Sequence, residues 1–160
     1  IQEHLVPWMK LDGPRSAQAF ADRLAEAPRR THLYTSISGA MDYAGRLFGQ
    51  RYEGMRRVVD ISGDGINNSG RPLAEARTEL LAQGVVVNGL AVIDNTPVPP
   101  SLAGVLPPLD EYYRDEVIGG PGAFLVVAEG FTAFEAAVRR KIIREIALAP
   151  PSAPQVVRVG

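Results

Sequence analysis

The 160-residue sequence contains no cysteine, which excludes disulfide bonds, thiolate catalysis and cysteine-based zinc sites but leaves the cellular compartment open. Histidine is almost as scarce, and His4 and His32 do not have the spacing of metal ligands. The Gly-x-x-x-x-Gly-Lys phosphate loop and the Gly-x-Ser-x-Gly nucleophile elbow are also missing. The common signatures of nucleotide hydrolysis and of serine or cysteine catalysis are therefore absent from this sequence.

The chain has no surplus of charge, because 17 basic residues oppose 18 acidic ones for a formal net charge of −1. This balance gives no electrostatic reason to expect a nucleic acid or an anionic membrane as partner. No apolar run reaches the roughly 18 to 20 residues of a membrane-spanning helix. The length suits one domain, but the chain begins at Ile1 instead of methionine, and we expect that upstream sequence is missing.

Hydrophobic periodicity divides the chain into alternating helices and strands. Apolar residues at helical spacing predict helices over 14–28, 36–49, 72–83, 109–117 and 132–147. Short runs rich in apolar and β-branched residues predict strands over 2–11, 57–62, 85–93 and 123–128, with 57–62 and 85–93 buried. The proline-rich stretch 97–108 is typical of an irregular surface loop, and the tail from Pro150 is expected to be disordered.

This alternation predicts an α/β fold with three layers, in which helices cover both faces of an open, mostly parallel sheet. In the final predicted helix, one face combines four apolar residues: Phe134, Val138, Ile142 and Ile146. Its basic run is interpreted as a solvated face and consists of Arg139, Arg140, Lys141 and Arg144. Ligands of such sheets bind at the carboxyl ends of the strands, so functional residues are expected in the loops there.

Two polar segments fall in those loops. The first follows the strand at 57–62 and contains Asp60, Ser62 and Asp64, whose oxygens suit Mg²⁺ or Ca²⁺. Its spacing partly matches an EF-hand, but Arg71 stands where that loop needs a bidentate glutamate, so an EF-hand is rejected. An ordinary strand-to-helix turn explains the same composition equally well. The second segment, 32–38, begins the helix at 36–49, where Thr35 and Ser36 also suit helix caps.

Together these segments resemble a von Willebrand factor A domain. The resemblance rests on residues 35–41 at a helix entry and on a strand that ends in Asp64-Gly65 before asparagine. More narrowly, a bacterial family of unknown function within that superfamily is similar at four segments, namely 58–68, 88–90, 112–113 and 117–124. The resemblance covers roughly residues 5 to 147 and implies a partial domain over 1–148 followed by a tail at 149–160.

The resemblance implies a Rossmann-like, doubly wound sheet with a metal-ion-dependent adhesion site on three loops. Thr35 matches the threonine of the second loop and Asp64 the aspartate of the third, while Ser36, Ser62 and Asp60 are weaker candidates. The first loop, Asp-x-Ser-x-Ser, is absent, so Mg²⁺, or Mn²⁺ or Ca²⁺, is expected to bind weakly or not at all. The first two strands of the family's sheet are expected to be missing as well, which would leave residues 2–11 unpaired and 57–62 at an exposed edge.

The function implied is a non-enzymatic protein-binding domain, in which an acidic residue of an unknown protein partner completes the coordination of the cation. The resemblance also implies export to the periplasm or the medium. One rival is a metal-assisted phosphoester hydrolase that uses Asp60, Ser62 and Asp64. A second rival is a metal-independent interaction surface on the loop at 97–108.

Overall fold

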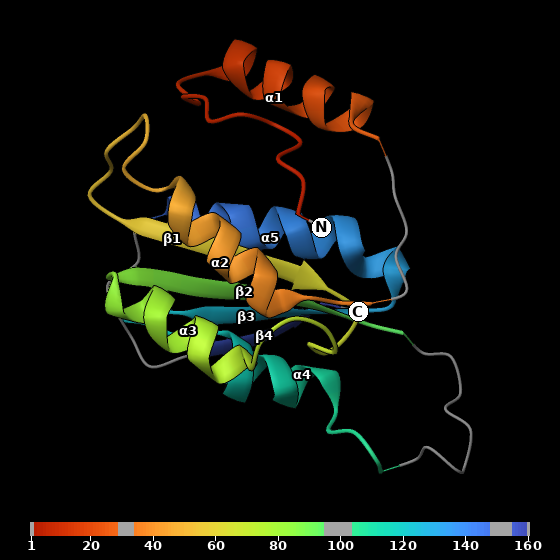
Figure 1. Ribbon diagram of the computed structural model, residues 1–160. Helices are drawn as coiled ribbons and strands as arrows, with labels where there is room; N and C mark the ends of the chain where they lie inside the picture. The colour runs from red at the N-terminus through yellow and green to blue at the C-terminus, as the bar shows by residue number, and fades with distance from the viewer. Residues whose placement is uncertain (1, 29–33, 95–103, 148–154, 160) are drawn as a thin grey trace.

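A computed structural model of the chain describes residues 2–28, 34–94, 104–147 and 155–159 (Figure 1). The helical elements are α1 (Pro14–Glu26), α2 (Ile37–Leu47), α3 (Leu73–Ala82), α4 (Leu109–Tyr112), the π-helical turn η1 (Tyr113–Val117), the 3₁₀ turn η2 (Phe131–Ala133) and α5 (Phe134–Ile146). The strands are β1 (Arg57–Gly63), β2 (Val85–Ile93), β3 (Phe124–Glu129) and β4 (Gln155–Val159). No helix among these residues is long and apolar enough to cross a membrane.

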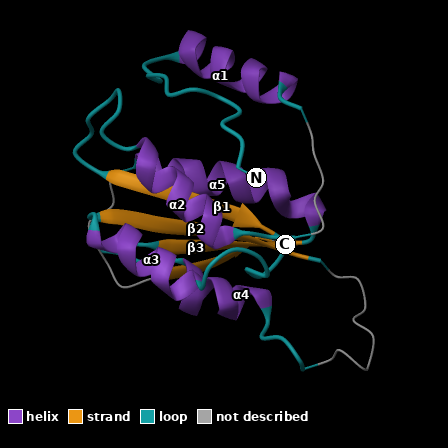
Figure 2. Cartoon of the chain, viewed as in Figure 1, coloured by secondary structure: helices purple, strands orange, loops and turns teal. Residues whose placement is uncertain are grey.

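The four strands form one parallel sheet in the order β1-β2-β3-β4 (Figure 2). On one face of the sheet, α2, α3 and η1 enclose a core that includes Met41, Leu80 and Tyr113. On the other face, Ala133 of η2 and Ala137 of α5 are buried against β2 and β3. The predicted three-layer α/β arrangement is confirmed, and its parallel strands place all their carboxyl ends along one edge.

The N-terminal segment forms no strand over residues 2–11, which differs from the prediction, but it is not paired with β1, as expected. Pro7 has no N–H to donate to a sheet. The segment lies against α2 instead, where His4 packs edge-on to Tyr43 and Trp8 packs on Phe48 at ring distances of 6.3 and 6.0 Å. The predicted helix follows as α1, but it buries none of its residues and lies apart from the sheet (Figure 1).

Strand β1 lies at the edge of the described sheet, with β2 as its one neighbour there. The prediction of a buried strand is wrong in detail, because only Val59 and Ile61 are buried. Side chains alternate between the two faces of a strand, so Asp60 and Ser62 point to the face that α5 occupies. This alternation decides which predicted ligands can meet.

Helix α5 faces the sheet differently from the prediction. The apolar side chains Phe134, Ile142 and Ile146 are 40%, 48% and 73% exposed, whereas Lys141 from the basic run is 5% exposed. Lys141 turns inward because Asp60 of β1 provides a carboxylate under the helix. The prediction of a solvated basic face is therefore wrong for Lys141, although Arg139 and Arg140 are exposed.

The prediction of a disordered tail is wrong for residues 155–159, which form β4 beside β3. Arg158 of this strand pairs with Glu129, at 2.7 Å, and with Asp110, so two ion pairs join β4 to neighbouring segments. Three predictions fall partly or wholly outside the described residues: His32, the part of the loop at 97–108 before residue 104, and the tail at 149–160 except for residues 155–159.

Candidate functional site

Two loops meet at the carboxyl edge of the sheet, one before α2 and one after β1. The Thr35 N–H donates to Oδ1 of Asn68 at 2.7 Å, and the Asn68 and Ser69 N–H groups donate to the Thr35 carbonyl at 2.9 and 3.2 Å. These bonds join residues more than thirty positions apart and satisfy backbone groups at the helix entry. Asn68 therefore fixes the position of Thr35 relative to the loop that contains Asp64.

Asn67 connects the same loop to two other elements. Its Oδ1 accepts a bond from the Ser38 N–H at 2.9 Å in the first turn of α2, and its N–H donates to the Tyr112 hydroxyl at 3.2 Å. Ser36 caps α2 by accepting from the Gly39 N–H at 3.2 Å. The first turn of α2, the loop after β1 and the end of α4 are thereby held together by hydrogen bonds.

Oxygen atoms crowd this junction. A Cβ atom at Gly65 would lie 3.2 Å from Oγ1 of Thr35, and one at Gly70 would lie 2.7 and 2.8 Å from the hydroxyls of Ser38 and Ser36. The structure thus brings Thr35 and Ser36 against the loop that begins at the exposed Asp64. Gly70, whose φ is +93°, allows the close approach that a side chain would block.

Two buried hydroxyls at this junction, those of Ser38 and Tyr113, have no hydrogen-bond partner in the described part of the chain. Burial, together with the negative charge of nearby Asp64, raises the pKa of the Tyr113 hydroxyl. That hydroxyl also lies 2.7 Å from where a Cβ at Gly63 would be. A buried hydroxyl without a hydrogen-bond partner lowers the stability of the fold. The hydroxyls of Ser38 and Tyr113 are therefore polar groups near this junction whose hydrogen bonding the surrounding protein leaves incomplete.

Replacing Tyr113 with phenylalanine tests whether this hydroxyl is unpaired. We expect Tyr113→Phe to raise the free energy of unfolding by about 1 kcal/mol, since the variant buries no unsatisfied oxygen. The matched variant Tyr112→Phe removes the bond to Asn67 and should lower it by about 1 kcal/mol. Urea denaturation in metal-free buffer measures both. A loss of stability in Tyr113→Phe would show that its hydroxyl has a partner.

Arg71 braces the end of the same loop. Its guanidinium forms a fork with Asp42 of α2, at 2.6 and 3.0 Å, and a second fork with Glu79 of α3, at 2.6 and 2.8 Å. The residue that excludes an EF-hand thus has a structural role. It anchors the loop from 64 to 71 to both helices on that face.

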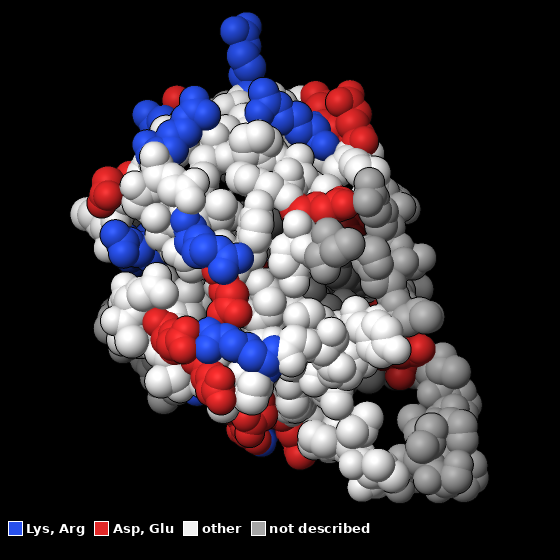
Figure 3. Space-filling view, in the orientation of Figure 1, with Lys and Arg blue, Asp and Glu red and all other residues white. Residues whose placement is uncertain are grey.

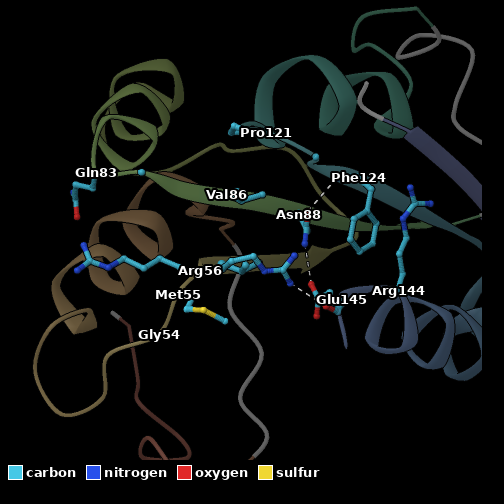
Figure 4. Close-up of a pocket in the computed structure, with 14 residues that line it drawn as sticks. Gly54, Met55, Arg56, Gln83, Val86, Asn88, Pro121, Phe124, Arg144 and Glu145 are labelled. Carbon is cyan, nitrogen blue, oxygen red and sulfur yellow. Dashed lines mark hydrogen bonds between the residues drawn. The ribbon is translucent and has the colours of Figure 1, made fainter. Parts of the chain in front are cut away.

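Asp60 lies outside this junction. It points to the opposite face of β1 and forms a salt bridge with the buried Lys141 of α5. Lys141 Nζ is also 3.7 Å from Oε1 of Glu145, and Asn88 of β2 donates to that oxygen at 2.9 Å (Figure 4). The carbonyl oxygen of the Asn88 side chain accepts from the Phe124 N–H at 3.1 Å. Asp60 therefore belongs to a polar cluster around the buried Lys141, made up of Asp60, Asn88, Lys141 and Glu145, which joins α5 to the sheet.

Glu145 has a raised pKa in this cluster. Burial and the proximity of Asp60 raise its pKa from an ordinary value of 4.5 to about 7, against the opposing effects of Asn88 and Lys141. Because the pKa is raised in the folded state, the stability contribution of Glu145 is fully present below pH 4.5 and is lost as the pH rises through about 7.

The variant Glu145→Gln tests this direction. At pH 8 we expect its free energy of unfolding to be about 1 kcal/mol higher than that of the original chain. Glutamine buries no charge and can still accept a hydrogen bond from Asn88. The difference should become small as the pH falls toward 4.5 and vanish below it, where Glu145 is protonated in both states. Thermal unfolding between pH 4.5 and 8 measures the trend, and a variant that is less stable at pH 8 would contradict it.

Of the five predicted ligands, the structure brings Thr35, Ser36 and Asp64 to one junction and places Asp60 and the exposed Ser62 on the other face of β1. Sequence reasoning assigned no role to Asn67, Asn68 or Tyr112, although the pair of asparagines after Asp64-Gly65 was the available signal. Across the described ranges, no three His, Cys, Asp or Glu side chains gather in a way that could hold a metal ion. The oxygens at the junction are mainly hydroxyls.

The face of the molecule that carries α2 and α3 has no large patch of positive or negative charge. Basic and acidic side chains lie interspersed over the face that carries α2 and α3 (Figure 3). This agrees with the net charge of −1. Long-range attraction of a highly charged partner to this face is therefore not expected.

Comparisons with known proteins give one match, to a family model. No curated protein and no solved structure matches the chain. A family model described as "Protein of unknown function (DUF1194)" matches residues 1–150. The chain therefore belongs to this uncharacterised family.

Proposed function

We propose that the chain is a non-enzymatic protein-binding domain, which weakly binds a divalent cation at the junction of Thr35 and Asp64, without the Asp-x-Ser-x-Ser loop of a complete site. The observation that supports this proposal most is the bonding of Asn68 to Thr35, because it holds these two loops together without using the Thr35 hydroxyl or the Asp64 carboxylate. Sequence resemblance to von Willebrand factor A domains supports it independently.

The donor set fits a hard cation. Thr35 and Ser36 offer neutral hydroxyl oxygens and Asp64 offers one carboxylate, which are ligand types that Mg²⁺ accepts. A single carboxylate leaves the ion with a net positive charge, so an acidic residue of a partner protein would be attracted to it. The unpaired hydroxyls of Ser38 and Tyr113 add buried polar atoms beside the same place.

A stability measurement with Mg²⁺ tests the proposal. If the dissociation constant is about 1 mM, 10 mM Mg²⁺ raises the free energy of unfolding by about 1.4 kcal/mol. We expect this gain to disappear in Thr35→Ala and Asp64→Asn and to persist in Ser62→Ala, which changes an exposed side chain on the other face of β1. A gain that is the same in all four proteins, or absent from all of them, would contradict the proposal.

The hydrolase hypothesis requires Asp60 and Asp64 to act at one centre. The salt bridge of Asp60 to Lys141 under α5 counts against that arrangement. A metal-independent surface is distinguished by partner binding that EDTA does not reduce. We therefore keep the proposal of an exported domain that binds an unknown protein partner, with Mg²⁺, Mn²⁺ or Ca²⁺ as the ion.

A further inference from the structure

A second site lies at the opposite edge of the sheet, where the strands begin. A cavity of about 500 Å³ opens there on the face that α5 partly covers. Its walls come from the segment before β1, the starts of β1, β2 and β3, and the C-terminal end of α5. This volume lies within the range of about 300 to 1,000 Å³ that holds small molecules.

The cavity has an apolar part and a polar part. Val58 and Val86 lie on the sheet face beneath it, and the exposed side chains of Met55 and Pro121 lie at its rim (Figure 4). At the other part, Figure 4 shows the side chains of Arg56 and Arg144 on either side of Asn88 and Glu145. A ligand that fills the cavity would therefore need an apolar body and a polar end.

The charges around the cavity favour a negative polar end. Three arginines, Arg56, Arg57 and Arg144, line it, and Glu145 is the one carboxylate among the lining residues. The carboxyl group of Glu145 already accepts from Asn88 and lies beside Lys141. Arg56 and Arg57 alone outnumber this carboxylate, so a ligand anion would meet more positive than negative charge.

Arg56 is held in a position to receive such an anion. One of its terminal nitrogens donates to the Glu145 carbonyl at 3.0 Å, at the end of α5. A guanidinium has five N–H donors, and this bond uses one of them. On the other side, Arg144 lies over the Phe124 ring, with its guanidinium carbon 4.6 Å from the ring centre. Both guanidinium groups are thus oriented before a ligand arrives, which reduces the entropic cost of binding.

We propose that this cavity binds a small organic anion with a flat apolar body, of the class of aromatic carboxylates, whose carboxylate pairs with Arg56 and whose body covers Val58 and Val86. Arginine suits this role because its planar fork matches a carboxylate. The site uses no residue of the Thr35 and Asp64 junction. It is independent of the proposed cation.

Naphthalene-2-carboxylate and its neutral analogue naphthalene-2-carboxamide form a matched pair of probes. In titrations followed by amide ¹H–¹⁵N NMR, we expect the carboxylate to shift the signals of Val86, Asn88 and Phe124 and to bind at least fivefold tighter than the carboxamide. Arg56→Gln should weaken the carboxylate about tenfold and change the carboxamide by less than twofold. Val86→Phe, which fills the cavity, should weaken both probes.

Arg140→Gln is the matched control, because Arg140 is an exposed arginine of α5 that does not line the cavity. It should leave both affinities unchanged, and melting temperatures show that each variant is folded. Equal binding of the two probes, an unchanged affinity in Arg56→Gln, or shifts centred on Ile142 and Ile143 would overturn the proposal. The last result would place the probe on the exposed apolar side of α5 instead.

Discussion

Lys141→Met is expected to lower the free energy of unfolding by about 3 kcal/mol at pH 8, the largest loss we anticipate from a change of charge. Methionine has a similar length, so the core volume is retained. The change leaves Asp60 and Glu145 facing each other without a cation, although both are partly accessible to water, which moderates the loss. At pH 5 the loss should be smaller, because the raised pKa of Glu145 leaves that carboxyl protonated in the folded state.

Two further variants make this prediction specific. Arg140→Met changes an exposed arginine of the same helix and should alter stability by less than about 0.5 kcal/mol. Adding Asp60→Asn and Glu145→Gln to Lys141→Met should recover much of the loss, since no unpaired charge then remains. Urea denaturation at pH 5 and pH 8 measures all of them. Equal losses in Lys141→Met and Arg140→Met would contradict the ionic cluster around the buried Lys141.

Gly89→Val is expected to lower the free energy of unfolding by about 3 kcal/mol. Gly89 lies in the middle of β2, and a Cβ there would come within 2.8 Å of Ile118 and 3.0 Å of Leu125. The Tyr113 ring would be 3.3 Å away. The missing side chain therefore makes room for η1 to pack on the sheet, and added methyl groups would force it outward.

Gly→Ala changes give a matched comparison. Gly89→Ala should cost about 1 to 3 kcal/mol, because even one carbon meets its neighbours. A Cβ atom at Gly13 would have no other atom within 4 Å, so Gly13→Ala should change the free energy of unfolding by less than about 1 kcal/mol. If both alanine variants proved equally stable, the close packing of η1 over β2 would be contradicted. Thermal or urea unfolding provides the comparison.

The arrangement of helices and strands in layers could largely be predicted, because it depends on the spacing of apolar residues along each segment. The helix at 37–47 and the strand at 85–93 show apolar patterns that admit one interpretation. The prediction of a strand at 2–11 was wrong because apolar residues around Pro7 suit a loop packed on α2 as well as a strand. Strand β4 was not predicted because a short apolar run after several prolines resembles a disordered tail. Its ion pairs, from Arg158 to Glu129 and Asp110, depend on contacts with distant segments.

The candidate site shows the same limit. Thr35 and Asp64 could be paired from the resemblance, and hydrogen bonds hold their loops together. Sequence alone could not tell that Asp60 faces away from Asp64, because this depends on the alternation along β1 and on a lysine eighty-one positions later. Lys141 looks like its exposed neighbours in a basic run until the carboxylate beneath it is known. Contacts between distant segments decide both cases.

Paramagnetic broadening by Mn²⁺ is the most direct test of the central claim, that a divalent cation binds between the loops of Thr35 and Asp64. In an amide NMR spectrum, micromolar Mn²⁺ should first broaden the signals of Thr35, Ser38, Gly65 and Asn67, even if binding is weak. Excess Mg²⁺ should restore them, and Asp64→Asn should prevent the effect. Broadening centred on other carboxylates, such as Glu129 and Asp110, or no selective broadening at all, would contradict the claim.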